Sequence, residues 1–205
     1  KVNFISFSVV FLLQKLQPVF AMLFAVIFLK EKISKKYLIW AILALVSAYF
    51  VTFKDGLVGF NTGDQTMIAA LFALGAAFAW GSSTAFSRFA LLRKSNTVVT
   101  GMRFLITSIL ALGFVFILGQ QSSLGTPTSS QWGRFVIIAF STGMVALWIY
   151  YRGLKNTQVK VATILELTFP FLAVIIDIFL YKNVLAPSQY IAAVVLLFAM
   201  YKVSR

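Results

Sequence analysis

The chain has 205 residues, of which 60% are apolar and only 11% are charged. A soluble domain carries roughly 25% charged residues, so this composition excludes a water-soluble globule. The mean hydropathy of +0.93 indicates that most of the surface faces lipid, and the expected fold class is an all-α membrane protein. The net charge of +13 is spread between apolar runs rather than gathered on a polar domain, so no nucleic-acid partner is expected.

The chain contains no cysteine and no histidine. Their absence removes disulfides, thiolate nucleophiles, imidazole bases and the usual zinc and haem sites. The sequence also lacks a GxxxxGK[ST] phosphate-binding loop, so the chain itself is not expected to hydrolyse a nucleotide. We therefore expect no enzyme activity, no metal and no cofactor.

Apolar runs long enough to cross a bilayer follow one another along the chain, separated by charged or Gly/Pro/Ser-rich breaks. Each run is too long for a strand and lacks the alternation of a barrel segment, so each is predicted to be a helix. The polar connections at 54–66 and 119–131 are too short for a soluble domain. The seven predicted spans run approximately from 7 to 29, 36 to 53, 67 to 87, 98 to 118, 132 to 151, 159 to 181 and 187 to 202.

Lysine and arginine fall mainly in one set of alternating loops. Short positively charged loops stay in the cytoplasm, so the richer set predicts a cytoplasmic C-terminus. The richer side carries Lys30, Lys32, Lys35, Lys36, Arg88, Arg93, Lys94, Arg103, Arg152, Lys155, Lys160, Lys202 and Arg205. The opposite side carries Lys54, Arg134 and Lys182.

An internal repeat places residues 9–51 on residues 161–203 without a gap, an offset of 152 positions. Composition alone can produce ten identities in 43 apolar-rich positions. What favours a true repeat is a shared proline with a polar residue four positions before it. These pairs are Gln14 with Pro18, and Glu166 with Pro170. An odd number of spans separates the copies, so they cross the membrane in opposite directions. Inverted repeats of this kind build secondary transporters, whose substrate sites lie near the midplane between the repeats.

The position of the two copies predicts a longer protein. Three predicted helices precede the second copy, whereas the first copy begins close to residue 1. We therefore expect a bundle of ten helices, arranged as five plus five, without its first three. In this interpretation residues 1–53 are the last two helices of the first repeat, 54–66 is an outer loop and 67–205 is the second repeat of five helices.

Four segments carry a family likeness: LLQKLQPVFAMLFAVIFLKEKIS, ALFALGAAFAWGSSTAFSRFA, GMRFLITSILAL and FSTGMVALWIYYRGLKNT. They resemble the EamA-like members of the drug/metabolite transporter superfamily, over essentially the whole chain. The resemblance implies ten helices, cytoplasmic termini, a central cavity for a small solute and a bacterial inner membrane. The glutamate that ends a helix in that family matches Glu31, while the second copy has Lys182 and Asn183 there, and Phe169 precedes Pro170 where the family often has glutamate. The family carries amino acids, sugars, nucleotide derivatives and drugs, so the substrate stays open.

Glu166 is the charged residue of greatest interest, because it is predicted to lie roughly 10 Å inside a span, approaching the midplane. An ionised carboxylate at that depth costs about 2.5–3.5 kcal/mol, so it should face a wet cavity or a partner, or be protonated. In the functional interpretation, Glu166 couples transport to protons or binds an amine of the substrate. In the structural interpretations, it forms an ion pair with Lys15 or Arg103, or is a protonated carboxyl bonded to a neighbouring helix. Thr163 and Pro170 share its helix face, and Pro170 permits a kink because it frees the Glu166 carbonyl.

The first copy contains an equivalent polar group. Gln14 and Gln17 share a helix face and are expected to hydrogen-bond a solute, while Lys15 is expected to point elsewhere. Pro18 is the matching hinge.

Two aromatic residues and one arginine complete the candidates. Trp80, with Ser83 three positions later, is predicted either to form a wall of the cavity on which a solute stacks or to be a buried packing residue. Arg103 either binds an anionic group or extends its charged end to the cytoplasmic surface. The predicted cavity lining is Gln14, Gln17, Trp80, Ser83, Arg103, Tyr151, Thr163 and Glu166, with Pro18 and Pro170 as hinges.

Small residues recur at every fourth position in the predicted span at 67–87. They are Ala69, Ala73, Ala77, Gly81 and Ala85. Such a ridge lets another helix approach closely. It serves either packing within the chain or contact in a homodimer.

The function that the sequence favours is secondary transport of small metabolites or drugs, with export as the expected direction. Transport would proceed by alternating access between the two inverted repeats. The alternative is a non-transporting membrane subunit or scaffold that binds partner proteins through its helices. That alternative predicts polar residues paired with one another and no wet cavity. The expected partners of the transporter are the lipid bilayer and a small solute.

Overall fold

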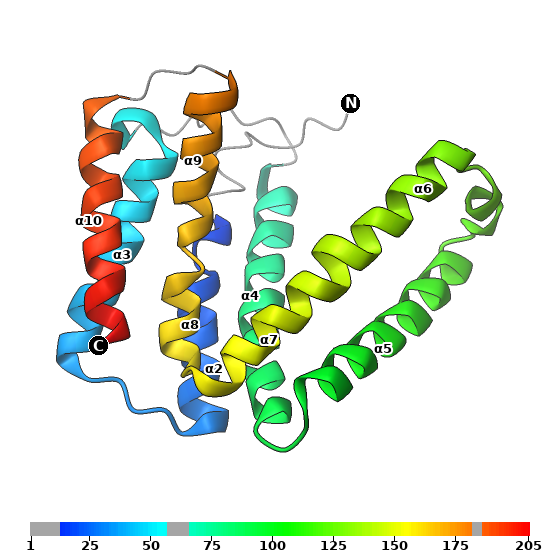
Figure 1. Cartoon of the computed structure of the whole chain (residues 1–205), viewed down its shortest axis with the longest axis horizontal. Helices are drawn as coiled ribbons and strands as arrows, with labels where there is room; N and C mark the ends of the chain where they lie inside the picture. The colour runs from blue at the N-terminus through cyan, green and yellow to red at the C-terminus, as the bar shows by residue number, and fades with distance from the viewer. Residues whose placement is uncertain (1–12, 57–65, 182–185) are drawn as a thin grey trace. The chain divides into compact units, whose positions relative to one another are not determined.

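The computed structural model describes residues 13–56, 66–181 and 186–205 (Figure 1). All regular elements in these ranges are helical, and the ranges contain no strand, which confirms the all-α class. The helices are α2 (Gln17–Leu29), α3 (Lys35–Thr52), α4 (Thr66–Leu91), α5 (Asn96–Ile117), α6 (Ser129–Ile138), α7 (Ala146–Asn156), α8 (Val159–Leu165), α9 (Thr168–Tyr181) and α10 (Pro187–Ser204). A π-helical turn (Ala139–Val145) joins α6 to α7, and short 3-10 turns occupy Lys54–Gly56 and Gln121–Gly125.

The predicted spans coincide with these helices. Five helical segments are long and apolar enough to cross a membrane: Lys35–Thr52, Ala70–Leu91, Asn96–Ile117, Ser129–Asn156 and Pro187–Ser204. The other two predicted spans are those that contain the repeated proline. The span at 159–181 is divided into α8 and α9, and the span at 7–29 begins among residues 1–12, which lie outside the described ranges.

The chain forms two compact units, Lys1–Phe86 with Gln158–Arg205, and Ser87–Thr157. The first unit contains α2, α3, most of α4, α8, α9 and α10, and the second contains α5, α6 and α7. These units cross the predicted boundary between the repeats at 54–66. Packing therefore groups the last helices of the chain with the first ones.

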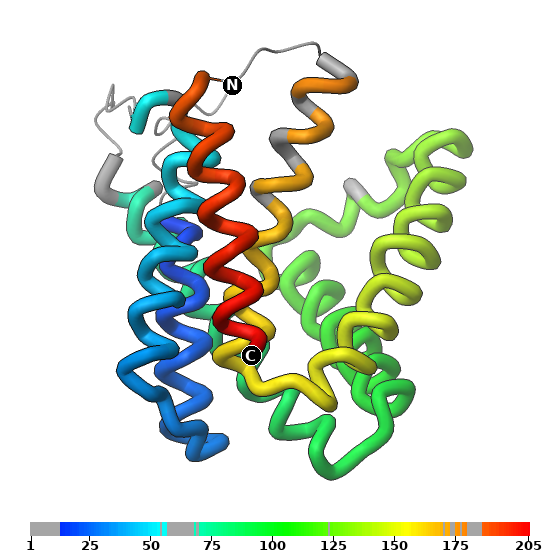
Figure 2. The backbone as a smooth tube through the Cα atoms, turned by 60° about the vertical axis from the view of Figure 1, so that its left-hand side comes forward, coloured from blue at the N-terminus to red at the C-terminus, as the bar shows by residue number. Residues whose placement is uncertain are grey.

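The core of the first unit lies mainly between α3 and α10 (Figures 1 and 2). The two helices are antiparallel, since Gln189 near the start of α10 donates a hydrogen bond of 3.0 Å to the Val51 carbonyl near the end of α3. The buried faces are rich in alanine: Ala41, Ala44 and Ala48 on α3, and Ala192, Ala193 and Ala199 on α10. Small side chains let the backbones approach, which matters in lipid because apolar surface alone gives helices no reason to associate.

The helix bounds repeat with the same offset as the sequence. Helices α3 and α10 both contain 18 residues and begin 152 positions apart. The chain leaves the helical conformation at residues 15–16 before α2, and at 166–167 between α8 and α9. The agreement supports the interpretation of two inverted copies of one helical unit.

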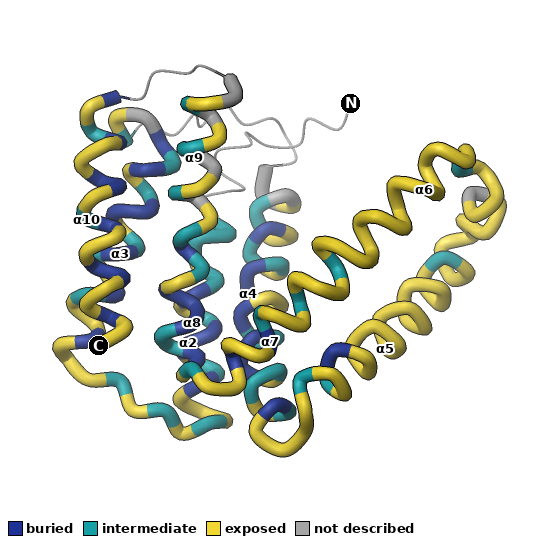
Figure 3. The backbone as a smooth tube through the Cα atoms, in the orientation of Figure 1, coloured by how far each residue is buried: buried dark blue, intermediate teal, exposed yellow. Residues whose placement is uncertain are grey.

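In the second unit, the predicted helix at 132–151 contains the π-helical turn. Ser141 Oγ donates to the Ile137 carbonyl at 2.6 Å, and Thr142 Oγ1 donates to the Ile138 carbonyl at 3.1 Å. Side-chain donors of this kind occupy backbone carbonyls where the helical pattern changes. Most side chains of α5 and α6 are exposed (Figure 3), as expected for apolar helices that face lipid.

Gly81 marks the close approach of α4 to α2. A Cβ atom at this position would lie 2.7 Å from the Gln17 carbonyl oxygen and 2.8 Å from the Ala21 nitrogen. Ala77 and Ala85, one turn away on either side, are fully buried. The small-residue ridge of α4 therefore packs within the chain at these positions, which answers the choice between internal packing and a homodimer contact for this part of the ridge.

Replacing Gly81 with alanine should lower the free energy of unfolding by about 1–3 kcal/mol, because the added methyl group overlaps backbone atoms of α2. The control is Gly75→Ala on the same helix, where a Cβ atom meets nothing within 4 Å and helix propensity improves. Thermal unfolding of the purified protein in detergent measures both variants. Equal unfolding temperatures for the two variants would contradict the close contact.

Candidate functional site

A cavity of about 500 Å³ lies in the first unit, between the segment that precedes α2, the middle of α4 and the junction of α8 with α9. Its size is within the range of about 300–1,000 Å³ that is typical of small-molecule sites. The lining residues are Gln14, Lys15, Gln17, Pro18, Trp80, Thr163, Glu166, Leu167 and Phe169. The structure thus brings together five of the predicted lining residues, namely Gln14, Gln17, Trp80, Thr163 and Glu166.

Two helix breaks explain why polar groups gather here. Proline has no N–H, so Pro18 and Pro170 deprive the carbonyls of Gln14 and Glu166 of their helical donors. The chain leaves the helix at or directly after each of these two residues, and the Glu166 carbonyl accepts a hydrogen bond of 3.0 Å from the Phe169 N–H instead. Non-helical backbone at membrane depth is tolerated only where protein buries it or where it lines a water-filled cavity. The cavity therefore lies where the two helix breaks leave backbone groups without helical partners.

One hydrogen bond joins the two copies across the cavity. Gln17 Nε2 donates to Glu166 Oε2 at 2.9 Å, although the residues are 149 positions apart. A carboxylate acceptor makes such a bond shorter and stronger than one between neutral groups. Glu166 therefore has a neighbouring helix as a partner and also lines the cavity.

Thr163 and Trp80 offer two further kinds of contact. Thr163 is fully buried, and its Oγ1 has no hydrogen-bond partner among the described residues. Buried hydroxyls are nearly always hydrogen-bonded, so Thr163 brings to the cavity wall a hydroxyl whose hydrogen-bonding capacity the described residues leave unused. Trp80 is 50% exposed although it lies in the middle of α4. Its exposure and its place in the lining favour the stacking wall over a buried packing residue.

Lys15 also lines the cavity, although the sequence predicts that it points elsewhere. The prediction assumed a continuous helix, in which adjacent side chains are turned by about 100°. The break at 15–16 removes that rotation, so Lys15 and Gln14 both reach the lining. The cavity consequently holds a cation, a carboxylate and two amides. Sequence analysis missed Lys15 and the apolar lining residues Leu167 and Phe169.

The remaining predicted residues are not among the described residues that line this cavity. Ser83 lies on α4 without reaching the lining. Arg103 and Tyr151 belong to the second unit, where Arg103 Nη1 donates to the Tyr151 hydroxyl at 2.7 Å. Ser87 Oγ lies 2.8 Å from the same hydroxyl, and Tyr151 is 1% exposed. These hydrogen bonds around the buried Tyr151 join α5, α7 and the last turns of α4.

Glu31 fixes the start of α8, the short helix that carries Thr163 toward the cavity. Its two carboxylate oxygens accept hydrogen bonds from the Val159 N–H at 2.8 Å and the Lys160 N–H at 3.1 Å. The first N–H groups of a helix have no partner within the helix, and their positive end favours an anion. The residue before α8, Gln158, gives no side-chain cap, so a carboxylate 128 positions away supplies it. The second-copy equivalents, Lys182 and Asn183, lie outside the described residues.

An apolar helical bundle with a polar cavity at two helix breaks is the architecture of a membrane transport protein. The chain belongs to the EamA-like transporter family, which matches residues 1–53 and 67–205. It is 39% identical over 204 residues to a protein of Fusobacterium nucleatum subsp. nucleatum named riboflavin transporter ImpX, a match that covers 100% of this chain and 68% of that protein. A solved structure, known only as the crystal structure of a protein, shares the fold with a TM-score of 0.76 and 19% identity, over 98% of this chain and 68% of that one. These findings confirm the expected family and a transport function rather than an enzymatic one.

Replacing Glu31 with glutamine should lower the free energy of unfolding by about 0.5–2 kcal/mol, because a neutral amide caps a helix less strongly than a carboxylate. The control is Asp55→Asn, which changes an exposed carboxylate that accepts a hydrogen bond of 2.8 Å from Ser188 Oγ. Such a surface change is expected to stay within about 0.5 kcal/mol. Thermal unfolding compares the two, and an effect of Glu31→Gln no larger than that of the control would contradict the capping role.

Proposed function

We propose that the cavity between the two breaks binds the transported solute, and that transport proceeds by alternating access. The observation that carries this proposal is the position of the cavity at two matched helix breaks, one in each inverted copy. Transporters built from inverted repeats bind their substrates at such broken helices and rock one repeat against the other. The hydrogen bond from Gln17 to Glu166 crosses between the copies, so rocking would break and re-form it.

The solute class that we propose is a flat aromatic heterocycle with polar substituents, with riboflavin as the specific candidate. The riboflavin transporter from Fusobacterium, at 39% identity, supports this choice. Trp80 offers an aromatic face to a fused ring. The amides of Gln14 and Gln17 match the carbonyl and N–H groups of such a ring, and Thr163 Oγ1 matches a hydroxyl. A cavity of about 500 Å³ admits a solute of that size class.

Orientation and direction form a second part of the proposal. The distribution of lysine and arginine supports a bacterial inner-membrane protein with a cytoplasmic C-terminus. In an alternating-access cycle the gradients of the solute and the coupling ion set the direction of net transport. Export is the expected direction, and assays in vesicles of both orientations distinguish it from import.

We also propose that Glu166 couples transport to protons. Glu166 accepts the Gln17 amide hydrogen bond and lines the cavity at the same time. Protonation removes the negative charge that strengthens this bond. A proton on Glu166 would therefore loosen the contact between the two copies at the solute site, which links proton binding to rocking.

Replacing Trp80 with alanine should raise the Kd for riboflavin about 10-fold, because the ring loses an aromatic stacking partner worth about 1.4 kcal/mol. Trp80→Phe should keep most of the affinity. The control is Trp132→Ala, which removes an exposed tryptophan on α6 that is not among the lining residues. Binding of riboflavin to the purified protein and uptake into vesicles measure the effect. Unchanged affinity in Trp80→Ala would contradict the placement of the ring, and absence of flavin transport by the unaltered protein would exclude riboflavin as the solute.

Replacing Glu166 with glutamine should abolish the pH dependence of transport while leaving solute binding measurable. Glutamine keeps the shape of the side chain and can still accept the Gln17 hydrogen bond, but it does not exchange a proton. The measurement is solute flux into vesicles with and without an imposed pH gradient. Asp55→Asn, an exposed carboxylate outside the cavity, should retain the full response. A pH response preserved in Glu166→Gln would exclude the coupling role.

A further inference from the structure

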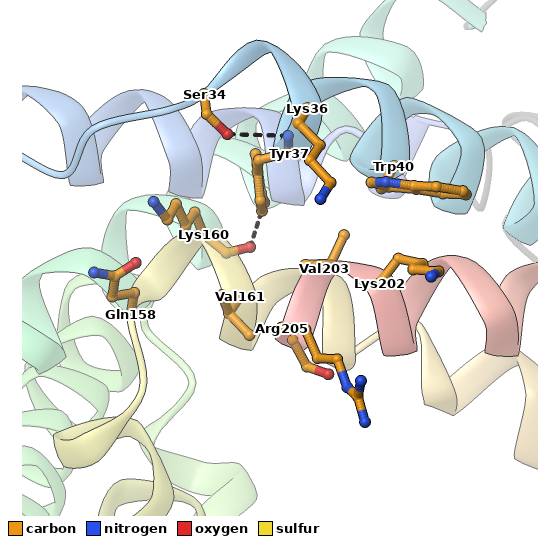
Figure 4. Close-up of a pocket in the computed structure, with 11 residues that line it drawn as sticks. Ser34, Lys36, Tyr37, Trp40, Gln158, Lys160, Val161, Lys202, Val203 and Arg205 are labelled. Atoms are coloured by element: carbon orange, nitrogen blue, oxygen red, sulfur yellow. Dashed lines mark hydrogen bonds between the residues drawn. The ribbon is translucent and has the colours of Figure 1, made fainter.

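A second cavity, of about 540 Å³, lies at the ends of α3 and α10 in the same compact unit (Figure 4). Its lining comes from the start of α3, the start of α8 and the end of α10. Four of its eleven lining residues are cations and none is a carboxylate; the cations are Lys36, Lys160, Lys202 and Arg205. We propose that this pocket binds a phosphate group, and that its source is the headgroup of an anionic membrane phospholipid.

The floor of the pocket is held by backbone contacts. The Tyr37 hydroxyl donates to the Lys160 carbonyl, and the Tyr37 N–H donates to Ser34 Oγ at 3.1 Å. Tyr37 is 8% exposed and Val203 is 5% exposed, so the floor is packed. The cations therefore stand around a fixed surface rather than on a loose loop.

Glu31, the acid that caps α8, is not among the described residues that line the pocket. Glu31 directs its two oxygens to the backbone N–H groups of Val159 and Lys160. The Lys160 ammonium donates to the Lys32 carbonyl, which leaves Lys36, Lys202 and Arg205 to meet a ligand. Of these three, Lys36 and Lys202 lie on two different helices. Figure 4 shows them on α3 and α10, on two sides of the pocket. Lysines contributed to one pocket by two helices suit the charge of a phosphate, which an ammonium binds as a point charge.

Comparison with the other copy of the repeat shows whether the packing of α3 against α10 needs these cations. At the equivalent positions, 152 residues away, the chain has Ser188 for Lys36, Phe50 for Lys202 and Phe53 for Arg205. The helix lengths are the same in both copies, and the opposite end of the pair is closed by Ser188 donating to Asp55. Packing of α3 against α10 therefore does not require cations at this end.

The pocket lies at the depth where lipid headgroups are found. Lys35–Thr52 and Pro187–Ser204 are candidate membrane spans, and the pocket is formed by the first turns of one and the last turn of the other. Tyr37 and Trp40 lie beside the cations (Figure 4), and tyrosine and tryptophan favour the membrane interface. Basic pockets between membrane helices are suited to anionic headgroups. The position of the pocket thus favours a phospholipid over a free phosphate ester.

The test is native mass spectrometry of the purified whole protein in neutral detergent, titrated with phosphatidylglycerol, phosphatidylcholine or inorganic phosphate. We expect phosphatidylglycerol to bind at least about 10-fold more tightly than phosphatidylcholine, because only the former carries a net negative charge. The double variant Lys36→Gln, Lys202→Gln should lose about 10-fold in affinity for phosphatidylglycerol. The double variant Lys36→Arg, Lys202→Arg should retain it.

The matched control is Lys94→Gln, Lys155→Gln, which removes two exposed lysines of the same predicted membrane side that do not line the pocket. An equal loss in this control would assign the effect to general surface charge and overturn the proposal. Equal affinity for the two lipids, or no binding of any of the three ligands, would also overturn it. Inorganic phosphate that binds with the same dependence on Lys36 and Lys202 would support the phosphate site and assign it to a soluble phosphate instead of a lipid.

Discussion

The hydrogen bond from Gln17 to Glu166 depends on the need of every helix in the first unit to satisfy its backbone hydrogen bonds. A helix in lipid must satisfy its own backbone, and a proline in each copy prevents this in one turn. The chain responds by leaving the helix on the N-terminal side of each proline, and the two breaks meet at one cavity. Because the polar side chains beside the breaks then face one another, Gln17 meets a carboxylate of the other copy at 2.9 Å. The position of the cavity therefore follows from the two turns in which a proline removes a helical hydrogen bond.

The geometry of this cavity also depends on a contact far from it. Helix α8 has only 7 residues, and so short a helix gains little from its own hydrogen bonds. Glu31 caps it, and the Tyr37 hydroxyl holds the Lys160 carbonyl in its first turn. The connection between α2 and α3, with the first turn of α3, therefore sets the position of the end of α8 that lines the cavity. Any rocking of one copy against the other must carry these contacts along or break them.

Composition and periodicity were sufficient to predict the helices, because each long apolar run has only one way to satisfy its backbone in lipid. The prolines and the polar residues four positions before them predicted the cavity, and five of the eight proposed lining residues reach it. The prediction for Lys15 was wrong because it assumed helical rotation through a segment that is not helical. The π-helical turn and the contact of Arg103 with Tyr151 depend on tertiary packing and on local side-chain hydrogen bonds, which spacing along a helix does not reveal.

The two copies share a backbone pattern, and they differ in the chemistry placed on it. At the break, one copy has Gln14 where the other has Glu166, so a neutral amide in one copy corresponds to a carboxyl group in the other. At the helix ends, one copy has Lys36 and the other has Ser188. In the transport cycle that we propose, symmetry of the backbone would present similar openings to both sides of the membrane, as alternating access requires. Departures from symmetry are then the places where direction, coupling and lipid contact can be encoded, since a fully symmetric chain would behave identically from either side.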